Sequence, residues 1–291
     1  MEMRQALCEC LDEMMAENEN IVVIDADLAK PNGTFPLRKK YPERAIDVGI
    51  AEQNMASVAA GMSSYGFIPF ITSFTPFASR RICDQIAISI AYAKQNVKII
   101  GSDPGISAEF NGGTHMSMED IGVLRSIPEL VIYEPVDVAQ FKQALPQIVA
   151  YEGPVYIRMF RKTIDDVFTD ANYKFDLFGA DCIQEGTAVT IFCSGIMVQE
   201  TMKANEILKQ EGIDAEIINI HTIKPIDRDA VVASAKKTGA VVVAENHNVI
   251  GGLTSAVCEV LMEEYPVPLR AVGVKDRFGQ VGKMPFLKEE Y

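Results

Sequence analysis

No stretch of this sequence is apolar for long enough to cross a membrane, which takes about 20 residues in a helix. Residues 1–11 also lack the basic start and the apolar stretch of a signal peptide. Positive charge is in deficit, because 27 Lys and Arg stand against 40 Asp and Glu and leave a net charge of -13. Such an acidic surface repels nucleic acid and anionic membranes. We therefore expect a cytoplasmic protein with neither of these as a partner.

The spacings of metal and nucleotide sites are missing as well. The six cysteines include no pair at the spacing of a zinc site, since Cys8 and Cys10 are separated by a single residue. Scattered cysteines in a cytosolic chain are mostly reduced apolar residues. The pair Gly251-Gly252 fits neither the Rossmann nor the P-loop spacing, which favours a packing or interface role. We predict no metal ligand in this chain.

What the sequence does contain is a regular alternation of short apolar runs and helical patterns. With 291 residues, of which 48% are hydrophobic, the chain is long enough for two medium-sized domains. Strands buried on both faces that alternate with helices indicate a parallel sheet covered by helices on each face. The expected strands are 21–24, 67–73, 97–101, 130–133 and 155–158, and later 188–192, 215–220, 240–244 and 271–274. The expected helices include 3–15, 82–94 and 139–149.

The alternation is interrupted at residues 165–181, a polar and aromatic stretch without a sustained period that is typical of a linker. We therefore predict an α/β protein of two domains, 1–164 and 182–291, each a mostly parallel sheet with helices on both faces. Ligands of such sheets bind beyond the carboxyl ends of the strands. The residues that fall at these ends include Asp27, Glu52, Phe74, Ser102 and Arg158.

Glu52 opens a helical pattern. It follows the apolar run 45–50 within Gly-Ile-Ala-Glu-Gln-Asn-Met (49–55), and the apolar residues after it recur at helical spacing. A carboxylate in the first turn meets the positive end of the helix dipole and caps the helix. From this segment alone, a structural cap and a functional carboxylate fit equally well.

Two further segments carry candidate binding residues. Phe74 and Phe77 lie three residues apart just after a strand, so they face one way and suit an aromatic ring, although core packing explains them as well. The arginine pair that begins at Arg80 suits an anion. His115 borders a loop rich in glycine, 102–120, where a structural role and a substrate contact fit equally.

Together these segments resemble transketolase. The motifs are Gly-Ile-Ala-Glu-Gln-Asn-Met (49–55), Thr-Ser-Phe-Thr-Pro-Phe-Ala-Ser-Arg-Arg (72–81), Gly-Gly-Thr-His-Met-Ser-Met-Glu-Asp (112–120), Thr-Ile-Lys-Pro-Ile-Asp (222–227) and Glu-Asn-His (245–247). Their order is similar to that of the carboxyl-terminal half of the family, which is a pyrimidine-binding domain followed by the last domain. The resemblance runs from about residue 1 to the end, and several motifs in one order make it specific.

The resemblance implies a role for Glu52 in binding thiamine diphosphate. The aminopyrimidine ring of this cofactor acts as a base when a carboxyl group hydrogen-bonds to its far nitrogen, and Glu52 matches that group. We expect an apolar pocket that helps to keep the carboxyl group protonated. Phe74 and Phe77 match residues that line this pocket, and Asp27 matches an aspartate near the thiazolium ring. Arg80 falls where relatives have an aromatic residue or an arginine.

The family's other half has no counterpart here. That half binds the cofactor's diphosphate through Mg²⁺ with a Gly-Asp-Gly motif, which does not occur in these residues. The resemblance therefore implies a split enzyme, in which an amino-terminal partner subunit supplies the diphosphate and Mg²⁺ contacts. Because active sites of the family lie between chains, we expect a heterotetramer with two copies of each subunit.

The resemblance also marks residues for a small sugar or sugar-phosphate substrate. Arg4 and Arg158 match two phosphate-binding arginines, and His115 matches a substrate-contacting position that we expect to be catalytic. Asp103 stands where a phosphate-binding histidine is expected, and Asn111 replaces an aspartate that contacts a sugar hydroxyl. A carboxylate near a dianion costs about 1 kcal/mol or more. We therefore expect a weaker preference for ordinary sugar phosphates, and a substrate that ends in a hydroxyl or a sulfonate or has a shorter chain.

We predict the carboxyl-terminal subunit of a thiamine diphosphate-dependent transketolase, which moves a two-carbon ketol unit from a ketose to an aldose. One alternative is a subunit of another enzyme with this cofactor, such as a deoxyxylulose-phosphate synthase or a 2-oxo acid dehydrogenase component. The other is a noncatalytic regulatory subunit. The joint presence of Glu52, Phe74, Phe77 and Asp27 argues against the noncatalytic alternative.

Overall fold

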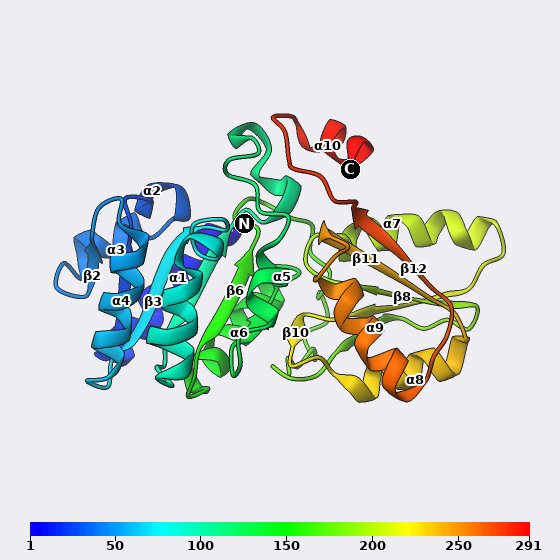
Figure 1. Ribbon diagram of the computed structural model, residues 1–291, viewed down its shortest axis with the longest axis horizontal. Coiled ribbons are helices and arrows are strands. Elements are labelled where there is room, and N and C mark those ends of the chain that lie inside the picture. The colour runs from blue at the N-terminus through cyan, green and yellow to red at the C-terminus, as the bar shows by residue number, and fades with distance from the viewer.

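The computed structural model describes all 291 residues as two α/β units that lie side by side (Figure 1). The first sheet contains β1 (Ile21–Asp25), β2 (Ala45–Asp47), β3 (Ile68–Phe74), β4 (Lys98–Ser102), β5 (Val131–Tyr133), β6 (Val155–Met159) and β10 (Thr222–Lys224). The second contains β7 (Asp181–Gln184), β8 (Val189–Cys193), β9 (Ala215–Asn219), β11 (Val241–Asn248) and β12 (Leu269–Val274).

Ten α-helices and three shorter or irregular helices connect these strands. The α-helices are α1 (Met3–Glu17), α2 (Ala29–Asn32), α3 (Phe35–Lys40), α4 (Glu52–Ser63), α5 (Asp120–Arg125), α6 (Val138–Ala150), α7 (Met197–Gln210), α8 (Arg228–Thr238), α9 (Leu253–Glu264) and α10 (Met284–Glu290). The others are the 3-10 helices η1 (Arg80–Ile82) and η3 (Gly105–Asn111) and the π-helix η2 (Gln85–Tyr92). None of the helices is long and apolar enough to cross a bilayer.

The strand order is β10-β5-β6-β4-β3-β1-β2 in the first sheet and β12-β11-β8-β9-β7 in the second. Every pair is parallel except β10 with β5 and β7 with β9. The predicted fold of two mostly parallel α/β sheets is therefore confirmed. The short strands β7 and β10 were missed, because segments of three or four mixed residues form no apolar run.

Helices cover both faces of the first sheet, and this explains its continuously apolar strands. One face packs against α1 and α6 through side chains such as Leu7, Leu11 and Phe141. The other packs against α4 and η2 through side chains such as Met55 and Ile86. All five residues of β1, β4 and β6 are buried, as expected for strands without a solvent-facing side.

The two units share a core. A single cluster of 34 buried residues extends from Ile24 of β1 to Leu261 of α9. The strand β10 belongs by sequence to the second half of the chain but pairs with β5 of the first sheet, so the sheets are not divided at residues 165–181 as cleanly as predicted. Figure 1 shows β10 at the junction of the two units.

A buried histidine at this joint predicts acid sensitivity. His221 is 1% exposed, packs between the rings of Tyr133 and Phe175, and contacts Thr222 Oγ1 through Nδ1 at 3.0 Å. Burial lowers the pKa of His221 to about 4, although the charge of Asp176 opposes the shift. Because the unfolded chain then binds this proton more readily, the stabilisation is present above about pH 6.5 and is lost as the pH falls.

We expect His221 to lower the free energy of unfolding by about 2 kcal/mol between about pH 7 and about pH 5. Urea denaturation of the wild type and of His221→Asn at both pH values measures this, since asparagine keeps a donor near Thr222 without the titration. Burial raises the pKa values of Asp25 and Asp181 to about 6, so these groups increase the free energy of unfolding as the pH falls. Their contribution is the same in both proteins and cancels in the comparison. Equal pH dependence in the two proteins would contradict the prediction.

Candidate active site

The candidate site lies at the carboxyl ends of β1, β3, β4 and β6, as parallel topology predicts. Residues that follow these strands meet the loop 103–118, which rises above the edge of the sheet beside the carboxyl-terminal tail (Figure 1). The site is therefore built by segments that are far apart in the sequence.

Glu52 begins α4, as predicted, and is 4% exposed. Its Oε1 accepts a hydrogen bond of 2.6 Å from Arg81 Nη1, and the two side chains form an ion pair. The expected apolar pocket therefore also contains a guanidinium group that faces the carboxyl group. The Arg81 side chain is 43% exposed and its guanidinium stacks on the ring of Phe77 at 3.7 Å from the ring centroid.

Three aromatic side chains gather next to this ion pair. The ring centroids of Phe74 and Phe77 are 6.3 Å apart, and His115 lies edge-on to both, at 6.0 Å from Phe74 and 5.2 Å from Phe77. The fold thus brings the two segments that the sequence analysis singled out, 72–81 and 102–120, into contact. Aromatic rings beside a buried carboxyl group suit a flat heterocycle.

Arg161 is a site residue that the sequence analysis missed. Its guanidinium lies over the ring of Phe74, 4.9 Å from the centroid, and its Nε forms an ion pair of 2.5 Å with Asp103 Oδ2. Arg161 Nη1 donates to the carbonyl oxygen of Pro31 at 3.3 Å, and Arg4 Nη1 donates to the same oxygen at 3.4 Å. Two guanidinium groups therefore meet beside the aromatic cluster.

The position of Asp103 also differs from the expectation. It is 1% exposed and lies in the left-handed region at φ 53°, where its carboxylate pairs with Arg161 rather than facing a substrate. Burial raises the pKa of Asp103, and the neighbouring positive charge of Arg161 opposes this shift. Asp103 therefore orients Arg161 and does not present a bare negative charge to an anion.

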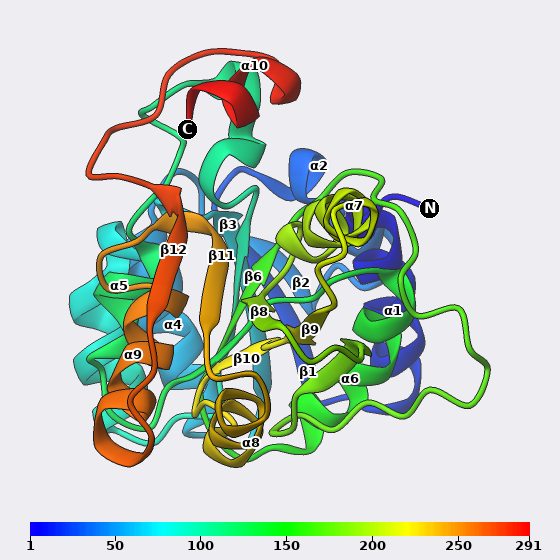
Figure 2. The same cartoon turned by 90° about the vertical axis from the view of Figure 1, so that its right-hand side faces the viewer.

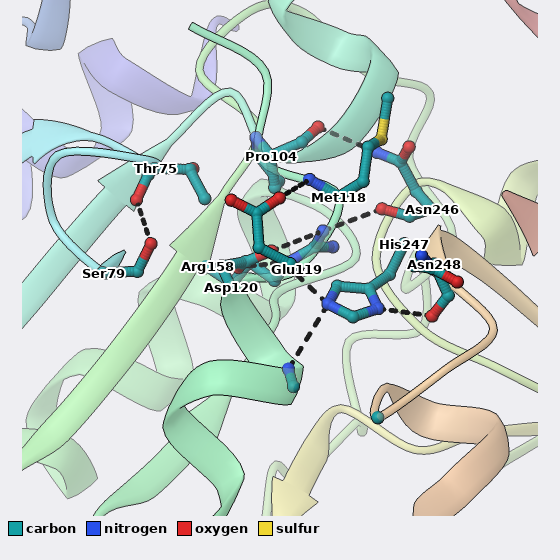
Figure 3. Close-up of polar contacts among 12 residues, drawn as sticks. Thr75, Ser79, Pro104, Met118, Glu119, Asp120, Arg158, Asn246, His247 and Asn248 are labelled. Carbon is teal, nitrogen blue, oxygen red and sulfur yellow. Dashed lines mark hydrogen bonds and ion pairs between the residues drawn. The ribbon is translucent and has the colours of Figure 1, made fainter. Parts of the chain in front are cut away.

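Arg158 is not in the site, which corrects the prediction that it binds substrate. The residue has no exposed surface. Its Nε donates to Asp120 at 2.8 Å, Nη1 to Glu134 at 2.6 Å and Nη2 to the carbonyl of Asn246 at 2.7 Å, as Figure 3 shows in part. All three guanidinium nitrogens donate to buried groups at the joint between the two units, so Arg158 does not reach a ligand.

The remaining predicted residues are all exposed. Arg80 turns toward Glu119 and forms an ion pair with it. Asp27 is exposed at φ 60°, and its N–H donates to Asp47 Oδ1 at 3.0 Å. Asn111 is exposed at the end of η3. These positions leave the three side chains open to solvent or to another chain.

A buried polar network braces the loop after β1. Asp25 accepts hydrogen bonds from Thr34 and Thr72, and burial raises the pKa of Asp25 to about 6. Asn32 donates to Thr72 at 3.2 Å and accepts from Ser102 Oγ at 2.7 Å. The network ties the loop that carries Pro31 to β3 and β4. The pattern that signals it is a set of small polar residues at the ends of apolar strands.

A metal ion has little support within this chain. The one group of side chains at ligand spacing is Cys182, Glu185 and Glu216, on the edge of the second unit. Lys237 already pairs with both carboxylates of this group. The aromatic cluster and Glu52 fit the aminopyrimidine ring of a thiamine cofactor.

Comparisons with known proteins agree with this arrangement. The family described as "Transketolase, pyrimidine binding domain" matches residues 1–165, and "Transketolase, C-terminal domain" matches residues 179–291. The chain is 53% identical over 289 residues to the 6-deoxy-6-sulfo-D-fructose transketolase subunit SqwH of Clostridium sp. (strain MSTE9), covering 99% of this chain and 89% of that protein. A solved structure described as "Split gene transketolase, inactive beta4 tetramer" is 42% identical, with a TM-score of 0.90 over 100% of this chain and 93% of that one.

A 1-deoxy-D-xylulose-5-phosphate synthase of Heliobacterium modesticaldum is also similar, at 32% identity over 289 residues. The match covers 99% of this chain but only 44% of that protein. The alternative that the sequence analysis left open is thus a more distant relative, and one that contains further sequence beyond the matched part.

The fold and the two family matches define the carboxyl-terminal half of a thiamine diphosphate enzyme. The chain belongs to the transketolase family, in which it corresponds to the carboxyl-terminal subunit of a split enzyme. The predicted family and the predicted transketolase function are therefore confirmed. Dependence on thiamine diphosphate follows from the family.

Proposed function

We propose that this subunit supplies the ring-binding and substrate-facing residues of a transketolase whose donor ketose ends in a sulfonate. An amino-terminal partner subunit holds the cofactor's diphosphate through Mg²⁺. The observation that carries this proposal is a continuous set of contacts that runs from Glu52 to Arg161, through Arg81, Phe77, His115 and Phe74. It has a carboxyl group at one end and an anion-binding guanidinium at the other.

Glu52 and the two phenylalanines form the part of the site that we assign to the cofactor's aminopyrimidine ring. Thiamine diphosphate, when bound, supplies the carbanion chemistry that breaks and forms the carbon–carbon bond. Glu52 holds a proton at the far nitrogen of the aminopyrimidine, while Phe74 and Phe77 orient the ring and exclude water. Arg81 must first release Glu52, and its half-exposed side chain has room to move into solvent.

His115, Arg161 and Arg4 form the part of the site that we assign to the donor ketose. Thr114 Oγ1 contacts His115 Nδ1 at 2.8 Å, which leaves Nε2 for a substrate hydroxyl. Arg161 and Arg4 offer two guanidinium groups, but Asp103 and Glu2 pair with them and reduce the local positive charge. Two guanidinium groups paired with two carboxylates leave little net positive charge, which suits a sulfonate monoanion better than a phosphate dianion. The 53% identical relative is named as a transketolase subunit for a sulfo-sugar, which supports the same substrate class.

The surface beside Glu52 supports a partner. Four large apolar side chains near α4 and η2 are more than half exposed: Ile50, Tyr65, Ile88 and Tyr92. Large apolar side chains with this much exposure are typical of a protein interface. A β4 tetramer of a related split transketolase is described as inactive, which agrees with a need for a second kind of chain. We propose an assembly with two copies of each subunit, in the cytoplasm.

The test is reconstitution with the amino-terminal partner, Mg²⁺ and thiamine diphosphate, followed by an assay of ketol transfer to an aldose. The donors are 6-deoxy-6-sulfofructose, fructose 6-phosphate and fructose. We expect transfer only when both chains are present, with kcat/KM for the sulfonate at least about tenfold above that for either other donor, or about 1.4 kcal/mol.

Two results would overturn parts of this proposal. Transfer by this chain alone would remove the need for a partner. Equal kcat/KM for the sulfonate and the phosphate would remove the substrate assignment but leave the transketolase function intact. Addition of EDTA to the reconstituted enzyme should abolish transfer if Mg²⁺ holds the diphosphate.

A further inference from the structure

The loop 103–118 carries the substrate-facing candidates Asn111 and His115 but has little regular structure of its own. Apart from η3, it is irregular, and it contains several residues with positive φ, among them Asp103 at 53° and Glu109 at 46°. Left-handed residues other than glycine persist where their surroundings hold them. Other parts of the fold must therefore support this loop.

The second unit holds the beginning of the loop through Asn246, at the carboxyl end of β11. Its Nδ2 donates to the carbonyl of Pro104 at 2.9 Å, and its Oδ1 accepts from the N–H of Ile106 at 3.0 Å. Asn246 is 5% exposed, so both bonds are shielded from water. Two residues on, the N–H of Asn248 donates to the carbonyl of Met118 at 2.8 Å (Figure 3). Both ends of the loop are thus bonded to β11.

The tail, residues 275–291, holds the outer part of the loop. Leu287 of α10 is fully buried in a cluster with Ile106, Ala108, Met116, Met118 and Val274. The N–H of Met284 donates to Glu109 Oε1 at 3.0 Å. The red tail and α10 lie against the loop in both views (Figures 1 and 2).

The tail passes so close to the loop that a side chain on Gly113 would meet the tail's backbone and one on Gly279 would meet the side chain of Met116. A methyl group on Gly279 would overlap the Sδ of Met116, and one on Gly113 would overlap the carbonyl oxygen of Gly279. Neither glycine has a positive φ, so close approach, not backbone conformation, excludes a side chain. The tail therefore lies against the residues on either side of His115.

We propose that Asn246 and the tail are positioning elements that hold the loop 103–118 in the conformation that presents Asn111 and His115 to the substrate. The carboxyl-terminal domain thus contributes to donor binding although none of its side chains lies in the aromatic cluster. The link to donor binding rests on the proposed function, whereas the ordering of the loop does not.

Hydrogen exchange on the full chain, followed by mass spectrometry, tests the ordering directly. In Gly279→Ala the added methyl group displaces the Met116 side chain from its cluster with Leu287, and we expect the amides of 106–118 to exchange at least about tenfold faster while those of β4 are unchanged. Asn246→Ala removes both bonds at the loop's beginning and should have a similar effect. Gly179→Ala is the control, because its methyl group would lie 3.4 Å from Asp176 Cβ, an ordinary contact.

The reconstituted enzyme provides the second measurement. We expect Gly279→Ala to raise KM for the donor at least about fivefold, with kcat changed less than about twofold and thiamine diphosphate affinity unchanged. A merely structural defect would lower the amount of folded enzyme and leave KM unaltered. Unchanged loop exchange in Gly279→Ala overturns the inference. If Gly279→Ala shows faster loop exchange but the reconstituted wild-type enzyme has no transketolase activity, the proposed function is overturned. The role of the tail in ordering the loop then still stands.

Discussion

Substitution of Glu52 by glutamine is expected to lower kcat of the reconstituted transketolase by about 10²–10⁴-fold, the range found when a general acid–base group is removed. Glutamine is nearly isosteric and still donates a hydrogen bond, but it cannot give up a proton to a ring nitrogen. The ion pair with Arg81 is also lost, yet Arg81 is half-exposed, so the free energy of unfolding should change by less than about 1 kcal/mol.

Glu43→Gln is a matched control for this prediction, because it makes the same chemical change at an exposed residue of the same unit. We expect it to leave kcat and the free energy of unfolding unaltered. The measurements are steady-state kinetics with both subunits, and urea denaturation of this chain alone. An E52Q enzyme within twofold of the wild-type rate would remove Glu52 from the catalytic machinery.

Substitution of Arg158 by methionine should give the largest loss of stability in this chain. The arginine bonds to Asp120 and Glu134 with no exposed surface, so its removal leaves two carboxylates buried without a positive partner. Breaking a buried ion pair in this way costs about 3–5 kcal/mol. Urea denaturation measures this cost, and the loss of the bond to Asn246 should weaken the joint between the two units as well.

Arg228→Met is the control for burial. Arg228 also pairs with two carboxylates, Glu263 and Glu264, but on the surface, where we expect a loss below about 1 kcal/mol. A loss of that size for R158M would contradict the structural role. Because Arg158 does not reach the site, any rise in the donor KM of folded R158M should be indirect, through its lost bond to Asn246.

The predictable parts of the fold are those that depend on local sequence patterns. Strand β1 and helix α1 appear in the sequence as an apolar run and a helical repeat, and both occur within a few residues of the expected bounds. The first turn of α4 was likewise visible, because Glu52 directly precedes apolar residues at helical spacing. The proximity of Phe74 and Phe77 followed from their spacing after a strand end.

The choice between Arg158 and Arg161 shows where local reasoning ended. Both arginines stand near the end of β6, and residue type and spacing do not distinguish them. Their surroundings in the folded chain distinguish them. The carboxylates of Asp120 and Glu134 bind Arg158. Arg161 instead pairs with Asp103 beside Phe74. This arrangement depends on the packing of several elements, one of which belongs to the second unit.

By itself, the sequence determined the alternation of strands and helices, the family, and the placing of a carboxyl group and two aromatic rings at one edge of a sheet. These depend on neighbours within a few positions along the chain. Only the tertiary structure decided which charges are neutralised: Glu52 by Arg81, Asp103 by Arg161, and Arg158 by two buried carboxylates. Coulomb energy depends on separation in space and on access to water, and the order of residues specifies neither until the chain has folded.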